Sequence, residues 1–372
     1  MKLLILFFIY ILSSDSFSSS AARLAGFPFE GKPGLKNALL DISGIEVGMT
    51  TVIEGGVDKK PIGSGPARTG VTVIFPTGKR GALTQVFAGW HAANGAGELT
   101  GSTWIEESGF LNGPIAITNT NSVGVVRDAI IKWYVLHNQP SENITLPVVG
   151  ETFDGFLSDI FAFHLKEQHV LDALNGAHAK ALPEGNVGGG TGMICFEFKC
   201  GTGTSSRIVE INKKGYTVAA LVQANFGLRH QLVLGGTKVG KVLKDNLVWN
   251  QEKGSIIGII ATNAPLLPHQ LKRIARRGTH GIARLGATSG DGSGDIFLAF
   301  STVNAQLPDS SGARSVEFLA NEDLDRIFEA TAQSVEEAVV NSMVQAKEMV
   351  GRDGHRVIRL PVENAIKLIP KS

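Results

Sequence analysis

The chain changes character abruptly where Asn250-Gln251-Glu252-Lys253-Gly254 meets Ser255-Ile256-Ile257-Gly258-Ile259-Ile260-Ala261-Thr262. The first stretch is polar and suits a solvated loop, whereas the second is an apolar run typical of a buried strand. Because Gly254 has no side chain, it can adopt strained backbone angles and leaves its carbonyl open to attack by the hydroxyl of Ser255. The junction is therefore either an ordinary turn before a strand or a peptide bond that the chain can cut itself.

Further apolar runs rich in β-branched residues predict other strands. They occupy residues 70–75, 193–198, 207–211, 217–222 and 296–302, in addition to 255–262. Apolar residues at helical spacing predict one helix after Pro268 and another over about 323–349. The face of the first helix would consist of Leu271, Ile274, Ala275 and Ile282. No repeat or long polar linker divides the chain, so we expect residues 23–372 to share one core.

The amino terminus has the pattern of an export signal. Lys2 precedes the apolar residues 3–12, and a small, polar stretch follows at 13–22. The apolar run is too short for a transmembrane helix, which needs about 20 residues. We therefore expect residues 1–22 to be removed and the mature protein to be secreted or periplasmic, without a stable membrane anchor. An uncleaved anchor is the alternative.

The composition is that of a globular enzyme without a strong charge bias. The 372 residues are 43% hydrophobic and carry a formal net charge of only +1, which gives no overall affinity for nucleic acids. The basic residues of the first predicted helix fit the solvated face of an amphipathic helix better than a nucleic-acid patch. They are Lys272, Arg273, Arg276 and Arg277.

The motifs of several enzyme classes are missing. The serine-hydrolase motif G-x-S-x-G and the zinc motif H-E-x-x-H do not occur. Asp291, Ser293 and Asp295 alternate as in a calcium loop, but Ile296 and Thr302 stand where that loop needs Gly and Glu. We expect neither a metal nor an organic cofactor.

The chain has two cysteines, Cys195 and Cys200. In a continuous strand, residues five apart lie on opposite faces. We therefore interpret both as small packing residues, with a strained local disulfide as the alternative.

The residues around the junction resemble a known family. Gly254 to Ile257, followed by Ala261 to Leu271, is similar to the cleavage region of the DmpA-like family, peptidase family S58. That family comprises the L-aminopeptidase/D-amidase-esterases and the β-peptidyl aminopeptidases. Further similar blocks follow in order along nearly the whole mature chain. They are residues 66–72, 118–128, 188–193, 223–227, 290–302 and 351–355.

The resemblance implies a four-layer αββα sandwich like that of the N-terminal-nucleophile hydrolases. It also implies an inactive precursor that cuts the bond between Gly254 and Ser255. The fragments 23–254 and 255–372 would stay together as one protomer, and we expect a homo-oligomer of such protomers. The freed Ser255 would combine a nucleophilic hydroxyl with an α-amine of pKa near 8, which can act as its base.

The resemblance also assigns residues that would assist the nucleophile. Ser293 and Asp295 lie two apart before a predicted strand, on one side of an extended backbone, and would orient proton transfers. Asp295 stands where some relatives have Glu. Asn225 would stabilise the developing oxyanion, and the glycine run 188–192 could add backbone amides or form only a turn.

Two further residues would recognise the substrate. Glu151 would pair with the free amine of the substrate and disfavour blocked amino termini. Phe153 stands where at least one relative has Tyr, so a hydrogen-bonding group is lost there. The difference bears on substrate preference more than on the reaction.

These expectations describe an autoprocessed serine aminopeptidase. It would release amino-terminal residues from short peptides, amides or esters through an acyl-Ser255 intermediate. One alternative is an amide-oligomer hydrolase or acyltransferase of the same fold group, although those relatives typically lead with Thr. Another is a secreted binding protein that has lost the activity. The intact Ser255, Ser293, Asp295 and Asn225 argue against that alternative.

Overall fold

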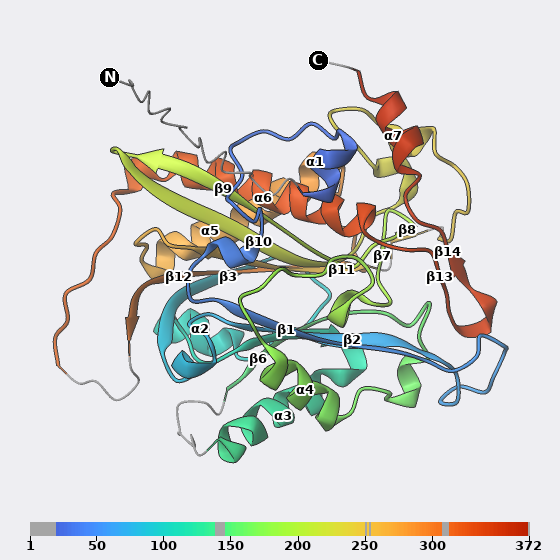
Figure 1. Cartoon of the computed structure of the whole chain (residues 1–372), viewed down its shortest axis with the longest axis horizontal. Coiled ribbons are helices and arrows are strands. Elements are labelled where there is room, and N and C mark those ends of the chain that lie inside the picture. Colours follow the sequence, from blue (N-terminus) through green and yellow to red (C-terminus); the bar gives the residue numbers. More distant parts are fainter. Residues whose placement is uncertain (1–19, 138–145, 250, 253, 307–311, 371–372) are drawn as a thin grey trace, which may run out of the picture.

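The computed structural model describes residues 20–137, 146–249, 251–252, 254–306 and 312–370. Two large sheets pack face to face, and helices cover the outer side of each sheet (Figure 1). This is the predicted αββα sandwich.

The six-stranded sheet contains, in spatial order, β4 (Phe110–Leu111), β3 (Gln85–Gly95), β12 (Gly294–Gln306), β11 (Ser255–Thr262), β10 (Lys214–Asn225) and β9 (Thr202–Ile211). The four-stranded sheet contains β1 (Glu46–Glu54), β2 (Ala67–Phe75), β5 (Ile115–Asn119) and β6 (Val148–Thr152). Two hairpins pair β7 (Ile194–Cys195) with β8 (Phe198–Lys199) and β13 (Met349–Val350) with β14 (Arg356–Val357). The helices are α1 (Ala21–Ala25), α2 (Ser102–Ser108), α3 (Val123–Leu136), α4 (Glu167–Gly176), α5 (Pro268–Arg284), α6 (Asp325–Val344) and α7 (Val362–Leu368).

Figure 1 shows the four layers of the sandwich. Three apolar cores lie between them. Helices α5 and α6 pack on the six-stranded sheet, where Ile256 and Ile260 of β11 point toward them. Ile257 and Ile259 of the same strand point toward the four-stranded sheet. Helices α3 and α4 cover the other face of that sheet. Alternate residues of β11 thus enter different cores, as the side chains of a strand must.

Strand β11 lies inside the six-stranded sheet, parallel to β12 and antiparallel to β10. The register pairs Ser255 with Gly294 on one side and with Asn225 on the other. The sheet therefore brings the predicted cleavage junction together with two segments that are distant in the sequence.

Most predicted elements are present. Strand β11 coincides with the predicted strand 255–262, and the predictions at 70–75, 207–211, 217–222 and 296–302 lie within β2, β9, β10 and β12. The helix predicted after Pro268 is α5, and the helix predicted over 323–349 is α6. The buried residues of α5 include Leu271, Ile274, Ala275 and Ile282. Helices α3 and α4 were not among the predictions.

The strand predicted at 193–198 is wrong. The chain reverses between β7 and β8, where Phe196 and Glu197 have φ values of 47° and 63°, as in a tight two-residue turn. The reversal brings Cys195 and Cys200 to a Cα separation of 5.6 Å, and they form a disulfide. The interpretation as mere packing residues is therefore wrong, because the strand between the cysteines is not continuous.

The basic residues of α5 lie on its outer, partly exposed face, as predicted for a solvated helix face. Arg276 is exposed. Lys272 pairs with Glu106, and Arg277 lies over the ring of Phe328.

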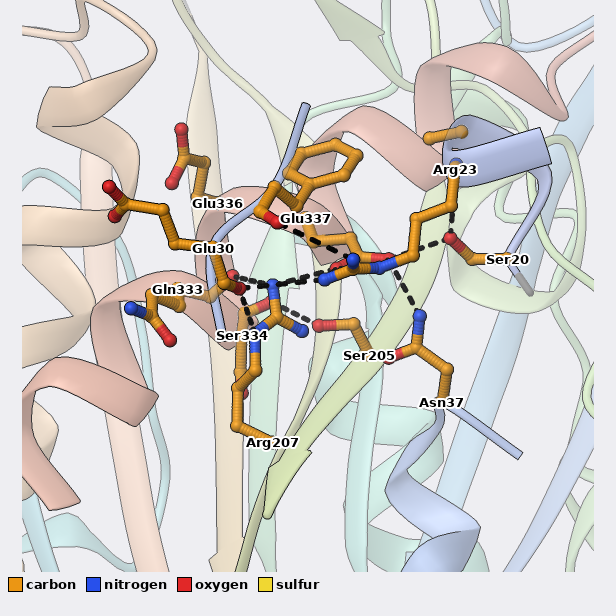
Figure 2. Close-up of polar contacts among 12 residues, drawn as sticks. Ser20, Arg23, Glu30, Asn37, Ser205, Arg207, Gln333, Ser334, Glu336 and Glu337 are labelled. Atoms are coloured by element: carbon orange, nitrogen blue, oxygen red, sulfur yellow. Dashed lines mark hydrogen bonds and ion pairs between the residues drawn. The ribbon is translucent and has the colours of Figure 1, made fainter. Parts of the chain in front are cut away.

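The segment that begins at Ser20 packs on α6 (Figure 2). The Ser20 hydroxyl donates to Glu337, Arg23 pairs with the same carboxylate, and Ala22 is fully buried. A signal cut after residue 22 would remove two of these residues. Residues 1–19 lie outside the described ranges, so the signal peptide stays a prediction. Within the described ranges, none of the helices has the length and apolar character needed to cross a membrane.

Candidate active site

Ser255 is the first residue of β11 and is buried, with 4% of its surface exposed. Its hydroxyl donates to the carbonyl oxygen of Gly254 at 2.6 Å. A Cβ at position 254 would lie 1.9 Å from the carbonyl oxygen of Asn225, which is closer than any side chain can approach. Glycine is thus required here by close backbone contact, and the hydroxyl lies beside the carbonyl group that it would attack.

The backbone amide of Gly294 lies close to the same two groups. Its nitrogen is 3.4 Å from both the Gly254 carbonyl oxygen and Ser255 Oγ. A backbone amide in this position can stabilise the negative charge that develops on an attacked carbonyl oxygen. This donor could not be predicted from the sequence, because the register that pairs Gly294 with Ser255 exists only in the folded sheet.

Ser293 and Asp295, the predicted relay, are joined by a hydrogen bond. Ser293 Oγ donates to Asp295 Oδ1 at 2.7 Å, and both residues are fully buried. Asp295 Oδ2 has no hydrogen-bond partner in the described part of the chain. Burial raises the pKa of Asp295, the hydroxyls of Ser289 and Ser293 oppose the rise, and the charge of Glu252 adds to it. A buried acid with a free oxygen next to a nucleophile suits proton transfer.

Ser293 and Asp295 are connected to Ser255 through the backbone. The register places Asp295 beside Ile256, one residue past Ser255. Among the described residues, no hydrogen bond joins the side chains of the relay to the Ser255 hydroxyl. The connection is Gly294, which lies between the two relay residues and contacts Ser255 Oγ.

Asn225 ends β10 directly opposite Ser255. Its Oδ1 accepts a hydrogen bond from the amide of Ile194 at 2.8 Å, and its Nδ2 donates to the carbonyl of Phe153 at 2.9 Å. These bonds fix the side-chain amide. Its Nδ2 carries a second N–H, which is suited to an oxyanion beside the nucleophile.

The glycine run 188–192 begins with a buried turn. The amides of Gly188 and Gly189 donate to the hydroxyls of Thr51 and Thr72. The next two amides, of residues 190 and 191, donate to backbone carbonyls of the turn. These four donors are used by the fold, so they do not form the cradle that the resemblance allowed.

Glu151 lies on β6 and is buried, with 4% exposed. The Thr120 hydroxyl and the Glu98 backbone amide donate to its two carboxylate oxygens. Burial raises the pKa of Glu151, and these two hydrogen bonds oppose the rise. A Cβ at Gly97 would lie 3.3 Å from Glu151 Oε1 and 3.1 Å from Gly294 Cα. The carboxylate is therefore close to the segment that pairs with the nucleophile.

Phe153 follows β6, and 42% of its surface is exposed. Its carbonyl accepts the hydrogen bond from Asn225. Its ring packs over Gly155, where a Cβ would lie 2.2 Å from the ring carbon Cζ. The exposed ring offers apolar surface without the hydroxyl that a Tyr would add.

Asp154 is a fully buried acid to which no sequence motif points. Neither carboxylate oxygen has a hydrogen-bond partner in the residues that the structure covers. Burial raises its pKa to about 7, although the side chains of Thr69 and Asn119 oppose the rise. Across all described residues, no three His, Cys, Asp or Glu side chains converge to hold a metal ion.

The family model of peptidase family S58 matches residues 37–357. The chain belongs to this family. It is 48% identical over 356 residues to the beta-peptidyl aminopeptidase BapA of Sphingosinicella microcystinivorans. The alignment covers 91% of this chain and 89% of that protein. It is 41% identical over 390 residues to the BapA of Sphingosinicella xenopeptidilytica, with coverages of 99% and 96%.

A solved structure has the same fold as this chain. The L-aminopeptidase D-Ala-esterase/amidase of Ochrobactrum anthropi matches with a TM-score of 0.87 and 42% identity, over 93% of this chain and 97% of that one. That enzyme is described as a prototype of the serine aminopeptidases with a variant of the Ntn hydrolase fold. The predicted family, fold and enzyme class are confirmed. The chain is a peptidase with the N-terminal-nucleophile hydrolase fold.

Proposed function

We propose that this peptidase cuts its own Gly254–Ser255 bond and then uses Ser255 as the nucleophile of an aminopeptidase. The single observation that carries the proposal is the contact at the start of β11. There, the Ser255 hydroxyl lies 2.6 Å from the Gly254 carbonyl oxygen, with the Gly294 amide beside both.

In the first step, Ser255 Oγ attacks the carbonyl carbon of Gly254. The hydroxyl proton moves to the nitrogen of Ser255, the C–N bond breaks and an ester forms between Gly254 and Ser255 Oγ. Water then hydrolyses the ester, leaving a carboxylate on Gly254 and a free α-amine on Ser255. The Gly294 amide, and the second N–H of Asn225 Nδ2, would stabilise the oxyanion.

In turnover, the new α-amine of Ser255 accepts the hydroxyl proton, since an α-amine has a pKa near 8. The hydroxyl attacks the substrate carbonyl, the leaving amine takes up a proton, and water releases the acyl group. Ser293 and Asp295 would orient these transfers beside the Ser255 backbone, a role supported by their hydrogen bond and by the free oxygen of Asp295.

The substrates we propose are short peptides, amides or esters with a free amino terminus. Glu151 would pair with the substrate ammonium, which is a strong interaction in a partly desolvated site. Because the curated relatives are β-peptidyl aminopeptidases, we extend the proposal to amino-terminal β-residues. We further propose that the mature protein is exported and assembles as a homo-oligomer of two-chain protomers.

Amino-terminal sequencing of the purified protein tests the proposal. The wild type should give two chains, one of which begins at Ser255, whereas Ser255→Ala should give a single uncut and inactive chain. A single wild-type chain with full activity would overturn the proposal, and so would a Ser255→Ala variant that is still cut at this bond.

A further inference from the structure

The linker before the junction carries a buried carboxylate with two backbone partners. Glu252 exposes only 9% of its surface. Its Oε1 accepts a hydrogen bond from the amide of Gly227 at 2.8 Å, and its Oε2 accepts one from the amide of Gly290 at 3.2 Å. The neighbouring Gln251, by contrast, is exposed.

These two amides belong to the two segments that supply the catalytic groups. Gly227 lies two residues after Asn225, and Gly290 begins the turn that leads to Ser293 and Asp295. One side chain of the linker therefore contacts the segment of the oxyanion donor and the segment of the relay at once.

The contact with the relay turn is close enough to restrict the residues there. A Cβ at Gly290 would lie 2.5 Å from Glu252 Oε2, and a Cβ at Gly292 would lie 3.2 Å from the backbone oxygen of Glu252. The turn thus fits around Glu252 because glycines occupy both positions.

A carboxylate is costly to bury unless hydrogen bonds satisfy it, and bonds from backbone N–H groups to an ionised acid are among the stronger ones. Both oxygens of Glu252 are satisfied in this way. A glutamine could accept from only one of the two amides, because its NH2 group would face the other donor.

We propose that Glu252 is a positioning residue for self-cleavage. It holds the linker against the two catalytic segments, so that the Gly254 carbonyl stays beside the Ser255 hydroxyl and the Gly294 amide. This inference rests on the proposed cleavage of the Gly254–Ser255 bond. Within the described residues, Glu252 forms no bond to the reacting atoms, although its charge contributes to the raised pKa of Asp295.

The test is the rate of self-cleavage of the full-length chain. The chain is made by cell-free synthesis, and its cleavage over time is monitored by gel electrophoresis. Glu252→Ala should slow cleavage about tenfold or more, because a displacement of the order of 1 Å can cost up to about 10²-fold. Glu252→Gln should fall between the wild type and Glu252→Ala. Gln251→Ala, the exposed neighbour, should cleave at the wild-type rate.

A second set of variants separates positioning from stability. Melting temperatures of Glu252→Ala and Glu252→Gln are measured in the Ser255→Ala background, where no chain is cut. Glu252→Ala should melt below the parent, because it leaves the amides of Gly227 and Gly290 without their acceptor. Both variants should still be folded at the temperature of the cleavage assay. Gly290→Ala should also slow cleavage, since its Cβ would displace the carboxylate. If Glu252→Ala does not fold, the self-cleavage rates of Glu252→Gln and Gly290→Ala test the inference instead.

Wild-type cleavage rates in Glu252→Ala, or slowing that only follows a loss of folded protein, would overturn the inference. A wild-type chain that is never cut would instead overturn the proposed function, and the role of Glu252 with it. The two failures are distinguishable, because the first leaves the wild type cleaved at Gly254–Ser255.

Discussion

Glu337 on α6 and Asp295 on β12 are both fully buried acids, yet their surroundings differ. The Glu337 carboxylate accepts hydrogen bonds from Arg23 and Asn37 and pairs with Arg207 (Figure 2). Asp295 has one oxygen bonded to a hydroxyl and another without a partner among the described residues.

The pKa values of the two acids move in opposite directions. Burial alone would raise both, but at Glu337 the charges of Arg207 and Arg23 outweigh it and hold the pKa below its usual value. At Asp295 burial prevails, and the pKa is raised. A fully paired buried charge holds parts of the fold together, whereas an under-partnered acid is costly and persists where chemistry uses it. The difference separates a structural cluster around Glu337 from the proposed catalytic pair of Ser293 and Asp295.

The largest loss of stability is expected at Glu337. Glu337→Ala leaves the buried Arg207 without its carboxylate and should lower the free energy of unfolding by about 3–5 kcal/mol. Urea unfolding in the Ser255→Ala background measures this on an uncut chain. The control is Glu348→Ala, because the side chains of Glu348 and its partner Arg356 are 41% and 58% exposed. It should cost less than about 1 kcal/mol, and equal losses in both variants would contradict the comparison.

At Ser293 and Asp295 we expect a loss of activity rather than a loss of stability. Asp295→Asn and Ser293→Ala should each lower turnover per cleaved chain by about 10²-fold or more, because they remove a group that assists proton transfer. Their stability should change little. Hydrolysis of an alanine p-nitroanilide, normalised to the cleaved fraction, measures the effect. Asp291→Asn, an exposed residue of the same turn, is the matched control. Near-normal turnover in both relay variants would make this segment structural.

A smaller effect is expected at Glu151. Glu151→Gln should reduce the preference for a free over an N-acetylated substrate by about tenfold or more, since a hydrogen bond to a charged group is worth about 1.5–3 kcal/mol. Ratios of kcat/KM for the two p-nitroanilides measure the preference. Glu98→Gln changes a neighbouring exposed acid and should leave the ratio unchanged. The proposed amine contact is wrong if Glu151→Gln also leaves it unchanged.

At Asp154 we expect a change in the pH dependence of stability. Its pKa rises from 3.8 to about 7 on folding, so between these values the folded chain retains a proton that the unfolded chain releases. Stability should therefore fall as the pH rises through this window. Asp154→Asn has no carboxyl proton to retain, so its stability should not fall in this way. The stability of Asp154→Asn minus that of the parent should therefore increase as the pH rises from about 4 to 7. Melting curves in the Ser255→Ala background test this, and a constant difference would contradict it.

The sequence predicts the elements whose signal is local. The apolar run of β11 and the spaced apolar face of α5 depend on neighbouring residues alone, and both formed as predicted. Helix α4 had a usable signal in Val170, Leu171 and Leu174, which share its buried face. The β7–β8 turn had none, because Phe196 and Glu197 adopt positive φ without the glycine or asparagine that usually marks such turns.

The residues of the candidate site also fall into those with a local sequence signal and those that depend on tertiary packing. The proposed cleavage junction and the proposed relay were predicted from their own residues and the family blocks, and both stay predictions. The Gly294 amide could not be predicted, because it depends on the register of β11 and β12. In the glycine run 188–192, the use of two amides also depends on distant residues, since the hydroxyls of Thr51 and Thr72 accept from Gly188 and Gly189. Burial of Asp154 likewise follows from packing, which no local pattern encodes.

The central claim is that the residue freed by cleavage is the nucleophile of turnover. Rapid acid quenching of the enzyme with an alanine ester, followed by intact-mass and peptide analysis, tests it most directly. The chain comprising residues 255–372 should gain the mass of one alanyl group, attached to Ser255. An alanyl group on another residue, or full turnover by a chain that is not cut at Gly254–Ser255, would show that Ser255 is not the freed nucleophile.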